Sequence, residues 1–307
     1  QAFLASCMFD VTQAEMVRNI RTAYYGYLVN RAILQTLAYQ DSIYKNFVAR
    51  AQLRLRTGES SNLELISARN KFQEIRALKI AVEADLRNHE LAFQQLLNTT
   101  DSIRPADGNY VLSWASIHTD ANLASNTQVA YELQNTKVAD AKVLVEKAKL
   151  LPEFTLGYSQ QLVMSALNLG GIDRTYASNT RMAGLQVGVS VPLFYGASKA
   201  KIKSEKIGSQ LARANYQAVQ SQLQVQYHQQ VQQYTKYEQS VNYYTSVGLK
   251  LADEELRIAQ LAFNLGEIGY MEYIQHVSAA VQSKLTYYDA VNRLNQSVIQ
   301  LQFLKKE

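Results

Sequence analysis

Cysteine is almost absent from the chain: Cys7 is the only one among 307 residues. An intrachain disulfide and a zinc site built from several cysteines are therefore excluded. Three prolines and 13 glycines are too few for a loop-rich or disordered protein. Charged residues make up 19% of the chain, below the roughly 25% of ordinary soluble domains. The difference is filled by Gln, Asn, Ser, Ala and 20 tyrosines, which suits long helices that face other helices or a polar lumen.

Several classes of function lack their signature. No stretch approaches the roughly 18 consecutive apolar residues of a transmembrane helix. The net charge of +5 is scattered rather than clustered, so we expect no nucleic-acid partner. GxxxxGK[ST] and GxSxG motifs are missing, and the four histidines lack metal-ligand spacing. We therefore predict no enzyme activity, no cofactor and no metal site.

The surroundings of Cys7 allow two interpretations. Leu4-Ala5-Ser6-Cys7 fits the pattern of small residues before an acylated cysteine. No basic and apolar leader precedes it, as a lipoprotein signal would require. We interpret Cys7 as an ordinary cysteine near a truncated start, with lipidation as the alternative.

One segment occurs twice. Residues 51–69 pair with residues 259–277, and 7 of the 19 aligned positions are identical. The identical positions include the glycine of each copy, Gly58 and Gly266, which lie 208 residues apart. Each copy is a short break between two long helical patterns, and a glycine is the usual residue at the end of a helix. A repeat of this size indicates duplication of a large unit, so we expect the tips of two long helical hairpins.

The first hairpin is predicted from residue 12 to about residue 98. Apolar residues recur at steps of three and four from Thr12 to Thr57, without a proline. About 46 helical residues would extend roughly 70 Å, which indicates a coiled coil or an extended bundle. After the break, Ser61 and Glu64 have the spacing of a capping box that starts the returning arm.

The rest of the chain separates into a middle segment and a second hairpin. Turn residues dominate Thr99–Ser125, with a short strand expected at Tyr110–Trp114. A helix of ordinary length is expected over Ala121–Leu151. The second hairpin is expected as one continuous helix over Ala197–Leu265 followed by a returning helix over Met271–Phe303.

Two runs change to a period of two. Glu153–Ser165 and the run that ends at Leu193 alternate apolar with small or polar residues, around a polar loop at Asn168–Thr180. Both runs are longer than usual strands, so we favour transmembrane β-strands over a soluble hairpin with one buried face. The residues predicted to face lipid are Phe154, Leu156, Tyr158, Leu185, Val187, Val189 and Val191.

The order of these parts resembles the TolC family of outer-membrane efflux proteins. The resemblance covers about residues 12–305 and rests on three motifs: Leu53-x-Leu55-x-x-Gly58-x-x-Ser61-x-Leu63-Glu64, Leu151-Pro152-Glu153-Phe154 and Val191-Pro192-Leu193-Phe194-x-Gly196. The tip QLRLRTGESSNLELISARNKFQEI is most similar to the heavy-metal efflux (CusC/CzcC-like) branch, or to TolC-like domains of fused metal-efflux permeases.

The resemblance implies a mainly α fold with a transmembrane β-hairpin. Two long antiparallel helical hairpins, forming an α-barrel, are duplicated about a β-barrel segment in a homotrimer. The domains are then residues 1–98 (first hairpin, with its preceding strands missing), 99–151 (equatorial segment with a short helix), 152–195 (β-hairpin) and 196–307 (second hairpin). An open strand edge in lipid leaves backbone groups unsatisfied, which agrees with closure by several copies.

One departure concerns the number of strands. Only two strands are visible, and at most Ala2–Phe9 could be the end of another. Three copies would give six strands, below the minimum of about eight for outer-membrane barrels. We therefore expect the chain to be N-terminally incomplete or part of a larger fused polypeptide.

The family also implies roles for the two tips. Acidic residues after the second tip line a constriction, and the matching positions are Glu272 and Gln275, with Phe263 as a further candidate. A ring of three Glu272 carboxylates would favour cations, whereas a solvated carboxylate is the simpler interpretation. The family's adaptor-docking tips correspond to Arg54, Arg56, Gly58, Glu59, Gly266 and Glu267.

The predicted function is a passive exit duct of a tripartite efflux system, for metal cations or small toxic compounds. Its expected place is the outer membrane of a Gram-negative bacterium, in contact with lipid, with the helices in the periplasm. The expected partners are a periplasmic adaptor (membrane fusion protein) and an inner-membrane RND-type pump. The alternatives are a type I secretion channel and a soluble coiled-coil scaffold or periplasmic adaptor.

Overall fold

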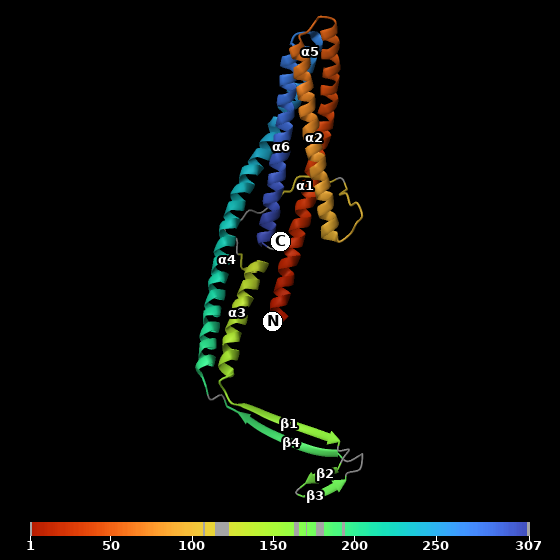
Figure 1. Cartoon of the computed structure of the whole chain (residues 1–307). Helices are drawn as coiled ribbons and strands as arrows, with labels where there is room; N and C mark the ends of the chain where they lie inside the picture. Colours follow the sequence, from red (N-terminus) through yellow and green to blue (C-terminus); the bar gives the residue numbers. More distant parts are fainter. Residues whose placement is uncertain are drawn as a thin grey trace. The chain divides into compact units, whose positions relative to one another are not determined.

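In the computed structural model, the described residues are 2–106, 108–113, 123–162, 166–169, 171–175, 181–191 and 194–305. Figure 1 gives the order of the helices and strands along the chain. The chain divides into two compact units, one comprising Gln1–Leu4 with Glu132–Ala218 and the other Ala5–Tyr131 with Val219–Glu307. The larger unit contains both predicted hairpin tips, and the smaller one contains the strands.

The first hairpin consists of α1 (Ala2–Arg56) and α2 (Asn62–Leu97). Helix α1 begins ten residues earlier than expected, so the interpretation of Ala2–Phe9 as the end of a strand is wrong. This stretch contains neither Gly nor Pro and is rich in Ala, Leu and Met, which have high intrinsic preferences for the helix. At the other end of the hairpin, Asn98 caps α2 in the left-handed conformation.

The second hairpin consists of α4 (Gly196–Tyr243), a π-helical turn η2 (Tyr244–Gly248), α5 (Leu249–Leu265) and α6 (Tyr270–Lys305). The prediction of one unbroken helix missed the π turn. Thr245 and Ser246 donate their hydroxyls to the carbonyls of Val241 (2.9 Å) and Asn242 (2.6 Å), which satisfies backbone oxygens beside the turn. In the described part of the chain, no helix has the length and hydropathy needed to cross a membrane.

A hydrophobic core joins the tip halves of the two hairpins. It contains residues of α1, α2, α5 and α6 that are buried at steps of three and four, among them Phe47, Leu65 and Val277. The buried row on α2 follows a period of seven, as in a coiled coil. The burial of these residues against other helices, rather than local preference, stabilises helices of this length.

Helices α2 and α5 each carry a further, mainly apolar row on an exposed face, interrupted by Asn70, Gln73 and Arg87 on α2 and by Glu254 on α5. We call these the free row of α2 and the free row of α5. Both follow heptad spacing, and every member is exposed in the single chain. The free row of α2 contains Leu63, Ile66, Asn70, Gln73, Ala77, Ile80, Ala84, Arg87 and Leu91; that of α5, which starts in η2, contains Val247, Leu251, Glu254, Ile258, Leu261 and Leu265.

The middle segment is irregular where a strand was expected. Residues 110–113 form no strand, and Trp114 lies outside the described residues. The side chain of Asn295 on α6 holds this segment, because it accepts from the N–H of Leu112 (2.8 Å) and donates to the carbonyl of Tyr110 (2.7 Å). A side-chain clamp thus replaces the ladder of a sheet.

The helix after the middle segment starts later than predicted. A 3₁₀ turn η1 (Leu123–Ser125) precedes α3 (Thr127–Ala148). The cause is Asn126, whose Oδ1 accepts from the N–H groups of Gln128 (2.9 Å) and Val129 (3.4 Å). Asparagine is a preferred N-cap residue, so the chain turns into the helix at this point.

The period-two runs form β1 and β4, and two short strands, β2 and β3, lie between them in the sequence. β1 (Glu153–Leu162) and β4 (Arg181–Ser190) pair antiparallel from Glu153↔Ser190 to Leu162↔Arg181. β2 (Ala166–Leu169) and β3 (Ile172–Thr175) form a second antiparallel pair. The prediction of a loop at 168–180 is therefore wrong for residues 168–169 and 172–175, and residues 170 and 176–180 lie outside the described part. Gly171 makes the tight turn between β2 and β3 with φ +82°.

Candidate functional site: the tips and the strand pair

The two tips have the same backbone structure. Gly58 and Gly266 end their helices with φ +78° and +77°, in the left-handed region. The next residue, Glu59 or Glu267, donates its N–H to a carbonyl five residues earlier, at 2.8 and 2.9 Å. This is the Schellman end of a helix, in which glycine takes the left-handed position without a steric cost. The sequence repeat therefore corresponds to a repeat of backbone geometry.

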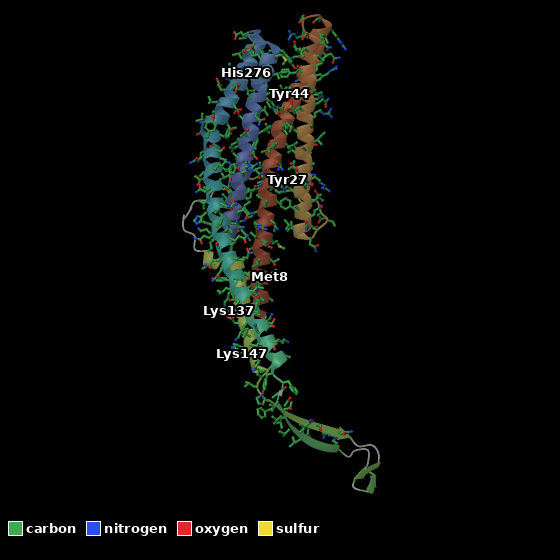
Figure 2. The ribbon with its side chains drawn as sticks, turned by 60° about the vertical axis from the view of Figure 1, so that its left-hand side comes forward. Met8, Tyr27, Tyr44, Lys137, Lys147 and His276 are labelled. Carbon is green, nitrogen blue, oxygen red and sulfur yellow. The ribbon has the colours of Figure 1, made fainter. Side chains whose placement is uncertain are left out.

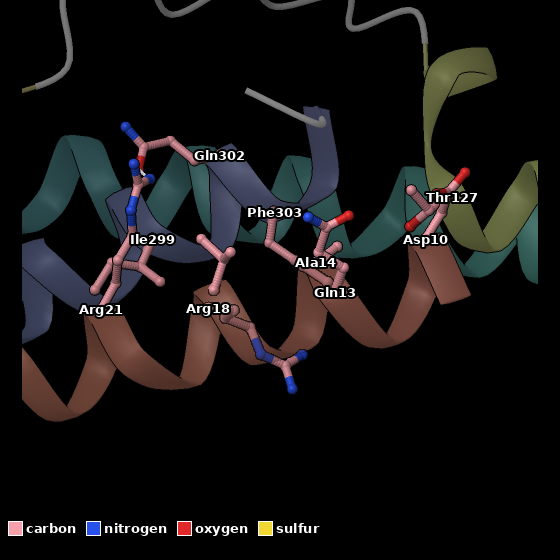
Figure 3. Close-up of a pocket in the computed structure, with 10 residues that line it drawn as sticks. Asp10, Gln13, Ala14, Arg18, Arg21, Thr127, Ile299, Gln302 and Phe303 are labelled. Carbon is pink, nitrogen blue, oxygen red and sulfur yellow. Dashed lines mark hydrogen bonds between the residues drawn. The ribbon is translucent and has the colours of Figure 1, made fainter. Parts of the chain in front are cut away.

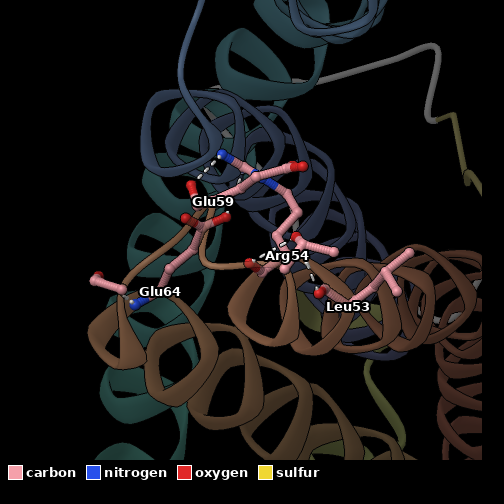
Figure 4. A network of polar contacts seen from close by, with 6 residues as sticks. Leu53, Arg54, Glu59 and Glu64 are labelled. Atoms are coloured by element: carbon pink, nitrogen blue, oxygen red, sulfur yellow. Dashed lines mark hydrogen bonds and ion pairs between the residues drawn. The ribbon is translucent and has the colours of Figure 1, made fainter.

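In the first tip, one arginine side chain forms hydrogen bonds across the turn. Arg54 donates to the carboxylate of Glu64 (2.9 Å) and to the carbonyl of Glu59 (3.3 Å), as Figure 4 shows. The Glu64 side chain is only 13% exposed. Ser61 also caps α2, since its hydroxyl accepts from the N–H of Glu64 (3.4 Å). Arg54 and Glu64 thus form hydrogen bonds within the turn. The side chains of Arg56 and Glu59 are exposed.

The second tip lacks this arginine. Ala262 occupies the place that corresponds to Arg54, and Glu272 the place of Glu64. Glu272 lies in the first turn of α6, where the helix dipole favours a negative charge. Glu272 and Gln275 are both exposed, and no cation of the described residues lies within ion-pair distance of Glu272. The second tip therefore presents an exposed carboxylate without an ion-pair partner among the described residues.

Phe263 belongs to an aromatic cluster around Phe47. Its ring stacks on Tyr273 with centroids 4.7 Å apart and also meets Phe47 edge-on at 6.4 Å. Tyr270 contacts Phe47 as well, at 5.5 Å. Burial raises the pKa of the Tyr270 hydroxyl, and the nearby Glu64 carboxylate adds to this effect. The cluster joins α1 to α5 and α6, so Phe263 lies between helices of one chain and is half-buried.

The second hairpin has polar contacts between its two arms, α5 and α6, that the pattern of apolar residues in the sequence did not predict. His276 Nδ1 lies 2.9 Å from Glu255 Oε1, and Lys284 Nζ lies 2.6 Å from Asp253 Oδ1. A further contact joins the two hairpins, since Tyr44 on α1 shares a hydrogen bond of 2.8 Å with Ser278 on α6. Figure 2 shows Tyr44 and His276 in the tip half of this unit. One signal was present: His276 and Glu255 are almost equidistant in sequence from Gly266.

The predicted lipid-facing residues share one face of the β1–β4 pair. Phe154 pairs with Val189, Leu156 with Val187 and Tyr158 with Leu185. These six side chains are between 59% and 79% exposed, and Val191 is exposed as well. The alternate positions carry Thr155↔Gly188, Gly157↔Gln186 and Ser159↔Gly184. The hairpin thus has one apolar and one polar face, and the apolar face ends at the pair Gln160↔Ala183, where a polar side chain takes the next position.

A cavity of about 310 Å³ lies between α1, α6 and the start of α3 (Figure 3). Arg21 donates to the side chain of Gln302 (2.6 Å), and Arg18 lies 4.6 Å from the centre of the Phe303 ring. Arg18, Arg21 and Gln302 in its lining therefore already have partners within the chain. The described residues also hold no group of three or more His, Cys, Asp or Glu side chains placed to bind a metal ion.

Of the comparisons with known proteins, the one with solved structures found matches to this chain, and these matches show its fold. No protein-family model and no curated protein match the sequence. A membrane protein from Pseudomonas aeruginosa has a TM-score of 0.84 at 14% identity, over 99% of this chain and 71% of its own. The Campylobacter jejuni outer membrane channel CmeC gives 0.84 at 12%, over 98% and 64%. CusC, a structure described for transmembrane channel formation, gives 0.79 at 17%, over 99% and 71%.

The matched structures agree on the class of fold. Nearly the whole chain takes the fold of TolC-like outer-membrane channels. The chain spans about two thirds to three quarters of the length of these proteins. Identities of 12–17% do not single out the heavy-metal branch.

Proposed function

We propose that this chain forms the outer-membrane exit channel of a tripartite efflux system. The observation that carries the proposal is the strand pair with one apolar face, attached to helical hairpins of the TolC-like fold. An apolar face of this size is exposed in the single chain and costs free energy in water, at about 25 cal/mol per Å². In the outer membrane the same face contacts lipid while the polar face lines a water-filled interior.

The free rows of α2 and α5 support assembly of several copies. Each row has the spacing of a coiled-coil seam and lies unpartnered along its helix in the single chain. The free row of α2 on one copy can pack against the free row of α5 on the next. Such head-to-tail contacts generate a ring when the rotation between neighbouring copies closes. We propose a homotrimer, in which the hairpins form a tube and the strand pairs contribute to a shared barrel.

The tips would meet the other components of the system. We propose that the Schellman turns, with exposed Arg56, Glu59 and Glu267, contact a periplasmic adaptor. Such turns present charge on a backbone that is fixed by hydrogen bonds. The energy would come from an inner-membrane RND-type pump, a partner carried over from the resemblance of the sequence.

Glu272 is the residue we propose to act on the substrate. Three copies would bring three unpaired carboxylates near the axis, where they would attract cations and repel anions. Cations, including metal ions, or small toxic compounds are therefore the proposed substrates. The heavy-metal assignment rests on the sequence of the first tip.

Conductance in planar bilayers tests the proposal. We expect the purified chain to form cation-preferring channels, and Glu272→Gln to lower the ratio of cation to anion permeability. Glu59→Gln removes the same charge at the first tip and should leave the ratio unchanged. Channels whose selectivity is unaffected by Glu272→Gln would remove the constriction from the proposal. A chain that forms no channels in any bilayer would contradict the proposed function itself.

A further inference from the structure

Lysines gather where the helices of the smaller unit meet its strands. The last turn of α3 and the residue just after it carry Lys147 and Lys149, and the first three turns of α4 carry Lys199, Lys201, Lys203 and Lys206. All six side chains are exposed. One ion pair joins the two helix ends, since Lys201 Nζ lies 3.7 Å from the Glu146 carboxylate, which also accepts a local contact of 2.6 Å from Lys149 Nζ. Figure 2 labels Lys147 at this end of α3.

Four of these lysines have no acidic partner in the described part of the chain: Lys147, Lys199, Lys203 and Lys206. The helix dipole disfavours a cation in the first turn of α4, where Lys199 lies, and this turn contains no acidic residue to offset it. Lys203 and Lys206 lie beyond that turn, and Lys147 lies in the last turn of α3, where a cation is favoured. The gathering of four exposed lysines without an acidic partner indicates an external partner of negative charge.

Exposed apolar and aromatic side chains lie where the helix ends lead into β1 and out of β4. Leu151 and Phe154 follow the end of α3, and Phe194 and Tyr195 precede the start of α4. All four are exposed, and Phe194 reaches 91%. Aromatic side chains flanked by lysines are typical of protein segments at the boundary between hydrocarbon and headgroups.

We infer that this lysine collar (Lys147, Lys199, Lys203 and Lys206) binds the headgroups of anionic phospholipids in the membrane leaflet on the helix side. The inference rests on the proposed function, since it takes the apolar face of β1–β4 as the lipid-contacting face. Phe154 is the first apolar residue of that face from the helix end, so the collar lies just outside the hydrocarbon. Lysines near an anionic surface each strengthen binding by about fivefold at low salt.

Lipid binding to the full chain in detergent tests the collar. Native mass spectrometry would follow titrations with phosphatidylglycerol and with phosphatidylcholine, at about 50 mM and about 500 mM salt. We expect tighter binding of phosphatidylglycerol, by tenfold or more, at the lower salt only. The variant Lys147→Gln/Lys199→Gln/Lys203→Gln/Lys206→Gln should lose this preference while keeping its binding of phosphatidylcholine.

A matched variant removes four exposed lysines elsewhere: Lys45→Gln/Lys137→Gln/Lys236→Gln/Lys250→Gln. Lys137 lies ten residues before Lys147 on the same helix, about 15 Å away, beyond the Debye length of about 10 Å at 0.1 M salt. This variant should keep the preference. Equal affinity of the wild type for both lipids, or an equal loss in both variants, would overturn the inference. Channel formation in bilayers separates these outcomes from a failure of the proposed function.

Discussion

A histidine and a glycine set the distance between the arms of the first hairpin. A Cβ added to Gly26 on α1 would lie 2.6 Å from the ring of His89 on α2. Only glycine leaves room for the imidazole at this position. Burial lowers the pKa of His89 below its ordinary value of 6.5, and the opposing effect of Asp85 is smaller. The ring is therefore held in its neutral form between the two helices.

The stability of the first hairpin should depend on pH through His89. Because the folded-state pKa lies below the ordinary value, the unfolded chain binds the proton more readily. Stability is then complete above pH 6.5 and is lost as the pH falls from 6.5 through the folded-state pKa. Thermal unfolding followed by circular dichroism at several pH values should show this loss. It should be absent in His89→Gln and retained in His228→Gln, which removes an exposed histidine.

At the scale of helices, the two tips are helix ends fixed by a backbone conformation. An L-residue in the left-handed conformation costs roughly 1–2 kcal/mol. A Cβ added at Gly58 or Gly266 would meet no other atom within 4 Å. The whole effect of a substitution there therefore comes from φ rather than from crowding, and it can be measured without a change in packing.

Gly58→Ala and Gly266→Ala should each lower the free energy of unfolding by about 1–2 kcal/mol. Gly208→Ala is the control, because Gly208 lies within α4 and a Cβ there also meets nothing within 4 Å. That change should instead stabilise the helix by about 0.5–1 kcal/mol. Melting temperatures should therefore move in opposite directions. Equal shifts at all three positions would contradict the role of the positive φ.

At the scale of the whole molecule, the proposed packing between copies through the free rows of α2 and α5 can be tested. Ile80→Lys in the row of α2, or Ile258→Lys in the row of α5, places a charge where a neighbouring copy should pack, and a buried unpaired charge is costly. We expect native mass in detergent to change from trimer to monomer. Ala81→Lys adds the same charge beside the row on α2 and should leave trimers intact. Trimers that persist in all three variants would place the contact elsewhere.

The sequence predicted the parts that repeat regularly and missed those that depend on single side chains. Periods of three to four and of two correctly indicated both helical hairpins and the β1–β4 pair. The irregular path at 110–113 was missed because it depends on Asn295, far away in sequence. The π turn at Tyr244–Gly248 was missed because one additional residue barely disturbs a pattern of apolar steps.

The candidate site was only partly readable from the sequence. Alternation alone identified the apolar strand face, since the register places Phe154, Leu156 and Tyr158 opposite Val189, Val187 and Leu185. The repeat located both tips. It did not indicate that Arg54 forms an ion pair with Glu64, whereas Glu272 has no such partner among the described residues. The constriction and docking roles of the tip residues remain predictions, because they depend on copies and partners outside a single chain.

The common backbone of the two tips also determines which of their properties can vary independently. The left-handed glycine and the backbone hydrogen bonds determine the shape of the turn, and neither depends on the side chain at position 54 or 262. The second tip has Ala262 where the first tip has Arg54, so the two turns differ in charge while their backbones have the same conformation. The two tips thus share one geometry, and the charge at each tip can differ without a change of that geometry.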